Sequence, residues 1–261
     1  MRDREVYITG ASGFLGSHLI EKLDVFTPIP HQEITTYDYK PYERFYFLSA
    51  YGNMPDHDDD PQVIQANVGD LLHVLSKSDF KHLESFVYIS TSSVRLKIQT
   101  LYSRTKKAAE EILLAFAEKY NAPICIIRPY SITGVGDQYK HLIPTLIRSC
   151  LLREKVDLVL DPVHDYIDAD DVAEGILNLS MNRAKGVFEL GNGVGYSNKQ
   201  VLAEVEEVCG CKANVNIVGN MRPYDTDDWV CKNFHARQYG WMPKKSLQQS
   251  IIEMVKEYEQ P

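Results

Sequence analysis

Residues 5–20, EVYITGASGFLGSHLI, decide the fold of this chain. The β-branched and aromatic run Val6 to Thr9 predicts a buried strand, and the apolar residues after position 16 recur at helical spacing. Between them, Gly10, Gly13 and Gly16 allow a tight turn, close approach of backbone to a pyrophosphate, and close helix–strand packing. The N–H groups of the helix start would then face the phosphates. This order predicts a dinucleotide site, although a purely structural turn has the same pattern.

An acidic residue follows the glycine-rich turn at a suitable distance. Residues 24–33 are rich in proline and predict a loop, and Ile34 to Tyr37 predicts a second strand with Asp38 at its end. A carboxylate there accepts hydrogen bonds from the adenosine ribose hydroxyls and repels a 2′-phosphate, so NAD is expected in preference to NADP. The alternative is an ordinary aspartate at a strand end.

Length and composition are those of a globular protein. The 261 residues suffice for one large α/β domain, with or without a small appendage, and the hydrophobic and charged fractions of 44% and 25% are ordinary. A net charge of −8 argues against a nucleic-acid partner. No apolar run reaches membrane-spanning length, the start is unlike a signal peptide, and the five cysteines form no CxxC pair. A reduced cytoplasmic protein without a membrane partner is expected.

Strands and helices alternate along the first half of the chain. Strands are expected at 44–50, 86–90 and 124–128, and helices at 63–75 and 101–120. The fold class is therefore α/β, a Rossmann-like doubly wound parallel sheet. The polar loop at 52–61, with Asp56, His57, Asp58, Asp59 and Asp60, is interpreted as solvated, and a metal site is not expected.

The second half has shorter elements and predicts a small α/β lobe. We expect residues 1–130 to form the dinucleotide-binding domain and residues 131–261 mainly the substrate-binding lobe, with later segments able to add strands to the sheet. The elements expected in this half are helices at 142–152, 169–181, 199–208 and 246–258, and strands at 158–160, 187–190 and 215–218.

A tyrosine and a lysine are candidates for catalysis. Tyr102 and Lys106 stand four residues apart near a helix start, which puts both on one helix face. A lysine cation near a phenol lowers its pKa, and the phenol then exchanges a proton with an alcohol or ketone. Thr91 and Ser92 follow the preceding strand, where a hydroxyl can hold the substrate oxygen. The alternative is an ordinary pair on a surface helix.

Together these motifs resemble the extended short-chain dehydrogenase/reductase family of NAD-dependent nucleotide-sugar epimerases and dehydratases. The resemblance covers nearly the whole chain. The matching segments are Thr9–Gly16 (the family's TGxxGxxG), Leu48–Ala50, Asn67–Val68 (NV), Ser90–Val94, Tyr102–Lys106 (YxxxK), Arg128–Ser131 (RPxN), His164–Ala173, Arg222–Asp225 (RPGD), and Tyr239–Pro243 with Ser246–Leu247 (LGWxPxxSL).

The resemblance implies a set of site residues. It assigns catalysis to Thr91, Tyr102 and Lys106, and substrate binding to Ser92, Ser131, His164 and Arg222, with Arg222 on a nucleotide diphosphate. The cofactor would be held by Gly10, Gly13, Phe14, Leu15, Gly16, Asp38, Leu48, Ser49, Ala50, Tyr102, Lys106 and Pro129. Relatives often dimerise through the helix carrying the Tyr–Lys pair, and its apolar residues fit a homodimer or a buried helix equally.

Four departures from the family pattern matter. The segment from Asp38 to Phe45 is too short for the usual helix, strand and helix, and only ten residues separate Thr91 from Tyr102. His164 replaces the usual arginine and would supply a weaker, pH-dependent charge. Ser92 and Ser93 stand where the dehydratases have Asp-Glu, so we disfavour dehydration.

The expected function is that of an enzyme acting on the C4 position of a nucleotide sugar with bound NAD. A 4-epimerase working through a 4-keto intermediate is the leading interpretation, and a 4-ketoreductase is the alternative. An NAD-binding protein or sensor without turnover is an alternative of another class. Because Thr91, Tyr102 and Lys106 are all present, an enzyme is favoured.

Overall fold

The computed structural model describes residues 5–54, 57, 60–219, 222, 223, 225 and 228–259. They form two compact units. Unit 1 comprises Met1–Pro129, Ala173–Glu189 and Phe234–Trp241, and unit 2 comprises Tyr130–Val172, Leu190–Asn233 and Met242–Pro261. None of the helices in the described ranges is long and apolar enough to cross a membrane.

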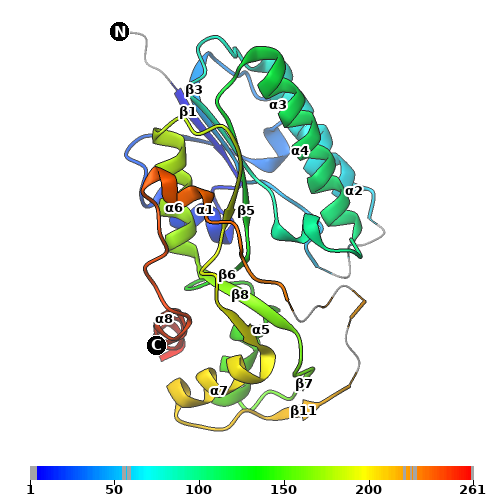
Figure 1. The fold of residues 1–261 in the computed structure, drawn as a ribbon, viewed down its shortest axis with the longest axis vertical. Helices are drawn as coiled ribbons and strands as arrows, with labels where there is room; N and C mark the ends of the chain where they lie inside the picture. The colour runs from blue at the N-terminus through cyan, green and yellow to red at the C-terminus, as the bar shows by residue number, and fades with distance from the viewer. Residues whose placement is uncertain are drawn as a thin grey trace. The chain divides into compact units, whose positions relative to one another are not determined.

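Unit 1 is built on a parallel sheet whose strand order is β2-β1-β3-β4-β5-β9 (Figure 1). This order confirms the predicted doubly wound α/β fold. All five residues of β4 are buried, which explains why the run from Phe86 to Ile89 is apolar and aromatic. The strands are β1 (Glu5–Thr9), β2 (Thr27–Ile29), β3 (Tyr42–Phe47), β4 (Ser85–Ile89), β5 (Ile124–Pro129) and β9 (Gly186–Leu190).

Helices cover both faces of this sheet, with α3 and α4 on one side and α1 and α6 on the other (Figure 1). The predicted bounds of α4 and α6 are confirmed. At the start of α4 the Thr100 hydroxyl accepts a bond from the Ser103 N–H, and at its end Asn121 adopts a left-handed conformation. The helices are α1 (Phe14–Ile20), α2 (Gln62–Ile64), the π-turn η3 (Gln65–Gly69), α3 (Asp70–Lys77), α4 (Leu101–Tyr120), α6 (Ala169–Met181), and the 3₁₀ turns η1 (His31–Glu33), η4 (Ser92–Arg95) and η5 (His235–Tyr239).

The second strand is not where the sequence predicts it. Residues 34–37 form no strand, and β2 lies at Thr27–Ile29, inside the stretch predicted as a loop. Pro28 is tolerated because β2 is the edge strand of the sheet. The β-branched and aromatic residues after it form the crossover to β3, and the rings of Tyr37 and Tyr39 pack edge-on against Tyr7. Side-chain packing in this crossover, and not strand pairing, explains its composition.

Unit 2 has two small sheets and three helices around one core. The sheets have the orders β10-β8-β6 and β11-β7, and residues of α5, α7 and α8 share a buried apolar cluster. Strands β6, β8 and β10 were not predicted from the sequence. The elements are β6 (Ser131–Thr133), α5 (Leu142–Leu151), β7 (Val156–Leu158), β8 (Val163–Asp168), β10 (Gly195–Ser197), α7 (Asn198–Cys209), β11 (Val215–Ile217) and α8 (Leu247–Glu259).

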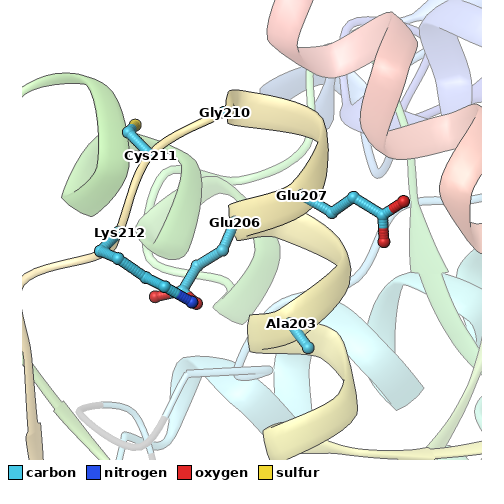
Figure 2. A pocket seen from close by; sticks show the side chains of 6 residues that line it. All are labelled: Ala203, Glu206, Glu207, Gly210, Cys211 and Lys212. Carbon is cyan, nitrogen blue, oxygen red and sulfur yellow. The ribbon is translucent and has the colours of Figure 1, made fainter.

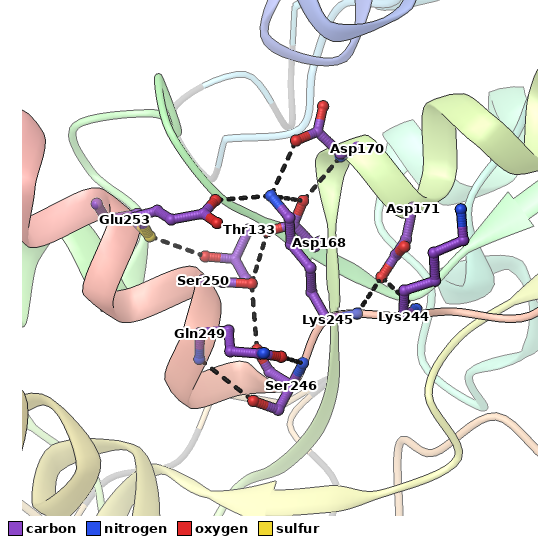
Figure 3. A network of polar contacts seen from close by, with 11 residues as sticks. Thr133, Asp168, Asp170, Asp171, Lys244, Lys245, Ser246, Gln249, Ser250 and Glu253 are labelled. Carbon is purple, nitrogen blue, oxygen red and sulfur yellow. Dashed lines mark hydrogen bonds and ion pairs between the residues drawn. The ribbon is translucent and has the colours of Figure 1, made fainter.

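A charged network ties α8 to the end of β8 within unit 2 (Figure 3). Lys245 Nζ lies 3.3 Å from Asp168, 2.9 Å from Asp170 and 2.6 Å from Glu253. The Asp171 carboxylate accepts bonds from the backbone N–H groups of Lys244 and Lys245 at 2.9 Å each. These contacts give the segment before α8 a structural role.

Candidate active site

The glycine-rich turn has no room for a side chain at two of its glycines. Gly10 has φ +71°, and a Cβ there would lie 2.9 Å from the backbone nitrogen of Ser49. A Cβ on Gly16 would lie 1.9 Å from the Gly10 carbonyl oxygen. Gly13 precedes α1 and has no side chain with which to cap it, and Phe14 and Leu15 are partly exposed in its first turn. No side chain of the described residues therefore caps the first N–H groups of α1.

The segment Leu48–Ala50 lies directly beside this turn. The Leu48 N–H donates to the Thr9 carbonyl at 3.3 Å and the Ser49 N–H to the Thr9 hydroxyl at 3.2 Å. The Ser49 hydroxyl is buried without a hydrogen-bond partner among the described residues. These two bonds place Leu48 and Ser49 directly against the residue that precedes the glycine-rich turn.

A buried asparagine joins that segment to α4. Asn67 is fully buried, and its side chain binds both the N–H and the carbonyl of Tyr51, at 3.1 and 2.9 Å. Its amide also donates to the Thr105 hydroxyl at 3.0 Å, and Thr105 donates to the Tyr102 carbonyl at 2.9 Å. Asn67 belongs to a segment that resembles a family motif, but its contact with the helix of Tyr102 was not predicted from the sequence.

Lys106 is a lysine buried in the interior of unit 1. It is 0% exposed, and within the described part of the chain its amine has no hydrogen-bond partner. Nζ lies 4.1 Å from the centre of the Tyr88 ring. Burial lowers the pKa of Lys106 to about 7, and nearby Glu110 opposes this shift. Tyr88 was not singled out from the sequence, since its contact with Lys106 depends on how β4 and α4 pack.

Tyr102 does not have the lowered pKa that the sequence analysis expected. Burial raises the pKa of its phenol to about 12. The expectation failed because desolvation dominates both groups and the Lys106 amine lies over the Tyr88 ring. Tyr102 nevertheless remains partly exposed, as an acid or base must be.

A chain of hydroxyls links Thr91 to the start of α4. Thr91 follows β4, accepts a bond from the Ser93 N–H at 3.2 Å and donates to the Ser93 hydroxyl at 3.0 Å. The Ser93 hydroxyl lies 2.7 Å from that of Ser103, the neighbour of Tyr102. Ser92 is buried beside them. The structure therefore brings Thr91 and the Tyr–Lys helix together, and the short connection between them is closed by Gln99, which donates to the Val94 carbonyl at 2.6 Å.

Asp38 does not lie at the end of β2 or of any other strand, which corrects its predicted placement. It is exposed in the crossover a few residues before β3 begins at Tyr42. Tyr42 pairs with Glu5 at the start of the parallel strand β1, whereas the glycine-rich turn follows the end of that strand. Asp38 thus lies near the amino-terminal ends of the parallel strands, whereas Gly10 lies at their carboxyl-terminal ends. Pro30, not a carboxylate, directly follows β2.

Unit 2 gathers three of the four predicted substrate residues. The Ser131 hydroxyl lies 3.3 Å from Nδ1 of His164, whose ring packs 5.0 Å from that of Trp229. Burial, with a smaller contribution from Arg222, lowers the pKa of His164 to about 4. The expected pH-dependent positive charge near neutrality is therefore wrong, because the imidazole is neutral there.

Arg222 is half exposed and engaged by a carboxylate. Its Nη2 lies 2.8 Å from Oδ1 of Asp225, and its Nε lies 3.1 Å from Oδ1 and 3.3 Å from Oδ2. This is the fork geometry in which a guanidinium also binds a phosphate. A diphosphate would have to share or displace Asp225.

Asp165, which is buried next to His164, binds three backbone N–H groups. Its carboxylate accepts the N–H groups of Asn192 at 2.9 Å, Gly193 at 2.7 Å and Cys231 at 3.1 Å. Burial raises its pKa, and the three N–H donors oppose that shift. The sequence analysis did not separate this structural carboxylate from the neighbouring binding candidate.

A depression of about 290 Å³ lies at the end of α7, and none of the predicted site residues lines it (Figure 2). It is lined by Ala203, Glu206, Glu207, Gly210, Cys211 and Lys212. Lys212 Nζ lies 2.6 Å from the Glu206 carboxylate, so these two charges of the depression pair with each other. Asp56, Asp58 and Asp59 of the acidic loop lie outside the described residues.

The parallel sheet, its bare glycine-rich turn and the Tyr–Lys helix define a dinucleotide-dependent enzyme of the extended short-chain dehydrogenase/reductase type. Residues 38–191, more than half of the chain, match the family model described as the NAD dependent epimerase/dehydratase family. The chain belongs to this family of enzymes, and NAD is the family's cofactor.

Individual relatives are distant. A dTDP-glucose 4,6-dehydratase of Actinoplanes sp. is 22% identical, with 97% of each chain covered. The solved structure of MoeE5 in complex with UDP-glucose and NAD has a TM-score of 0.86 at 21% identity and 98% coverage of both chains. A UDP-glucose 4-epimerase of Thermotoga maritima, solved with UDP-glucose, has a TM-score of 0.86 at 20% identity, with 98% and 99% covered. These likenesses establish the fold.

The residues of unit 1 fit NAD. The bare backbone of Gly10–Gly16 suits a pyrophosphate, and any Cβ at Gly10 or Gly16 would collide with backbone. The buried Lys106 amine, without a hydrogen-bond partner in the described ranges, is a donor that a ribose hydroxyl could satisfy.

Proposed function

We propose that this protein is an NAD-dependent nucleotide-sugar 4-epimerase. The proposal rests above all on the buried Lys106 amine on the helix of Tyr102, which is joined through hydroxyls to Thr91. A buried amine without a bond is costly in a purely structural helix, whereas a cofactor-binding helix needs such a donor. Unit 1 would bind the dinucleotide and unit 2 the substrate.

In this proposal each active-site residue has a separate role. Tyr102 takes the proton of the sugar C4 hydroxyl and later returns it, while Thr91 orients the C4 oxygen. Because its pKa lies at about 12, Tyr102 acts as a base only beside positive charge, and protonated Lys106 is this chain's own source. Lys106 also holds the nicotinamide ribose. NAD supplies the reversible oxidation of C4.

The substrate side is proposed on the residues of unit 2, together with Ser92. Arg222 would bind the diphosphate, and Ser131 and His164 would contact the substrate as neutral hydrogen-bonding groups. A homodimer through α4 is part of the proposal, since Leu114 and Tyr120 of that helix are exposed. The positions of Ser92 and Ser93 support epimerisation over dehydration, because neither hydroxyl replaces a carboxylic acid.

The test is product analysis with a panel of UDP sugars, including UDP-glucose, UDP-N-acetylglucosamine and UDP-glucuronic acid. We expect an epimer to appear by NMR with NAD in catalytic amount, whereas a 4-ketoreductase would consume reduced cofactor stoichiometrically. Tyr102→Phe should lower conversion by on the order of a hundredfold or more. Tyr120→Phe, at the exposed far end of the same helix, serves as the matched control. If UDP, TDP and GDP all fail to bind at millimolar concentration, the nucleotide-sugar assignment is wrong. Tight NAD binding without conversion of any sugar would favour the sensor alternative.

A further inference from the structure

The surroundings of Lys106 contain a second tyrosine. Tyr88 lies in β4, is fully buried, and presents its ring to the Lys106 amine at 4.1 Å from the ring centre. Its own hydroxyl is also buried without a hydrogen-bond partner in the part of the chain that the structure describes. The ring face, and not the hydroxyl, is therefore what Tyr88 offers to its neighbour.

Two other ionisable groups stand near Lys106, and one of them, Glu110, also favours its protonated form. Glu110 lies one turn further along α4, but its carboxylate is gripped by Arg128 of β5, with Arg128 Nε at 2.8 Å from Oε1. Tyr102, one turn before, is a neutral phenol at physiological pH. An aromatic face attracts an ammonium by about 0.5–2 kcal/mol, more when both are desolvated. Tyr88 is thus the group in direct contact that favours the protonated amine.

We propose that Tyr88 is a positioning residue, whose ring holds the protonated form of Lys106 at the carboxyl edge of the sheet. The inference rests on the proposed role of Lys106 in cofactor binding and in the activation of Tyr102. A deprotonated lysine would lose the charge that Tyr102 needs and one of its three donor hydrogens. Tyr88 therefore acts on the reaction through Lys106 without touching substrate.

Ring and hydroxyl can be separated by substitution. Tyr88→Phe keeps the ring, whereas Tyr88→Leu and Tyr88→Met remove it, with Met filling more of the space. The matched control is Phe86→Leu, which removes a buried ring from the same strand that stacks on Phe45 and not on Lys106. If Tyr88 is merely a core residue, all three ring deletions should have equivalent effects.

The experiment measures the titration of Lys106 directly in the protein without cofactor, by NMR of ¹³Cε-labelled lysine assigned with Lys106→Arg. We expect Tyr88→Phe and Phe86→Leu to titrate like wild type, and Tyr88→Leu and Tyr88→Met to lose about tenfold in proton affinity. NAD affinity at pH 7, followed by fluorescence, should fall in the same two variants only.

An unchanged Lys106 titration in both ring-deletion variants would overturn the proposal, as would an equal shift in Phe86→Leu. If Tyr88→Leu does not fold, Tyr88→Met supplies the same readout. Because the titration needs neither substrate nor turnover, a failed epimerase assay would leave this result intact, and the two proposals fail separately.

Discussion

Two lysines, one in each unit, have opposite surroundings. Lys106 on α4 is fully buried against an aromatic ring, and burial lowers its pKa to about 7. Lys245, before α8, has three carboxylates within 3.3 Å, and its bonds to Glu253 and Asp170 raise its pKa despite the opposing effect of burial. The protein itself supplies the partners of the Lys245 ammonium, so this charge stabilises the packing of its neighbours. It supplies no hydrogen-bond acceptor for the Lys106 amine among the described residues, so this side chain is available to a ligand.

This contrast should be largest in turnover. Lys106→Met, like Tyr102→Phe, should lower kcat/KM by on the order of a hundredfold or more, because each removes a group proposed to act in the transition state. Lys245→Met should keep turnover per folded molecule within a few-fold. Steady-state kinetics of each variant, corrected for the folded fraction, test this prediction. Equal losses of kcat/KM in Lys106→Met and Lys245→Met would contradict the proposed difference between the two lysines.

The pH dependence of stability should come next in size. The folded pKa of Lys106, about 7, lies below its ordinary value of 10.5, so the unfolded chain binds more protons between these values. Lys106 should therefore make the protein without cofactor more stable as pH rises from 7 towards 10, by at most about 1.4 kcal/mol per pH unit. Urea unfolding gives the free energy of unfolding of wild type and of Lys106→Met at each pH, and the difference between them is the contribution of Lys106. If the two free energies changed with pH in parallel, the prediction would be refuted.

At neutral pH we expect Lys245, and not Lys106, to contribute to the free energy of unfolding. Lys245→Met leaves Asp168, which is almost fully buried, without its cation, and should lower the free energy of unfolding by ~2 kcal/mol. Lys106→Met removes a desolvated amine that has no hydrogen bond among the described residues, so stability should stay equal or rise. Denaturant titration of both variants tests this, with the exposed Lys119→Met as control.

The smallest effect is expected at the half-exposed Arg222. Asp225 already engages its guanidinium, so Arg222→Ala should weaken UDP binding by only ~1 kcal/mol. Since the pKa of His164 lies at about 4, protonation of this imidazole should add no pH dependence to UDP affinity between pH 6 and 8. Isothermal calorimetry across that range provides the check, and a His164-dependent fall in affinity would show that the imidazole carries charge there.

The sequence predicted most of unit 1 because its signals are local. The glycine-rich turn, the matching bounds of α4 and the approach of Thr91 to that helix all follow from residues close in sequence or from parallel strand order. Asp38 was misplaced because Ile34–Tyr37 has strand-like residues, while the true β2 contains Pro28 and is stable only as an edge. Tyr88 and the neutral state of His164 depend on burial by distant segments, which no local pattern contains.

The crossover between β2 and β3 also has a consequence for folding kinetics. Only 12 positions separate Ile29 from Tyr42, so the parallel partners Glu5 and Tyr42 are 37 residues apart in the chain (42 − 5). Loop-closure entropy grows roughly as (3/2)RT ln n, so omitting a helix, strand and helix lowers the entropic barrier to bringing β1 and β3 together. Parallel sheets fold slowly because their contacts are distant in sequence. In this chain the β1–β3 pair forms across a segment that holds only α1, β2 and η1, which favours its early appearance during folding.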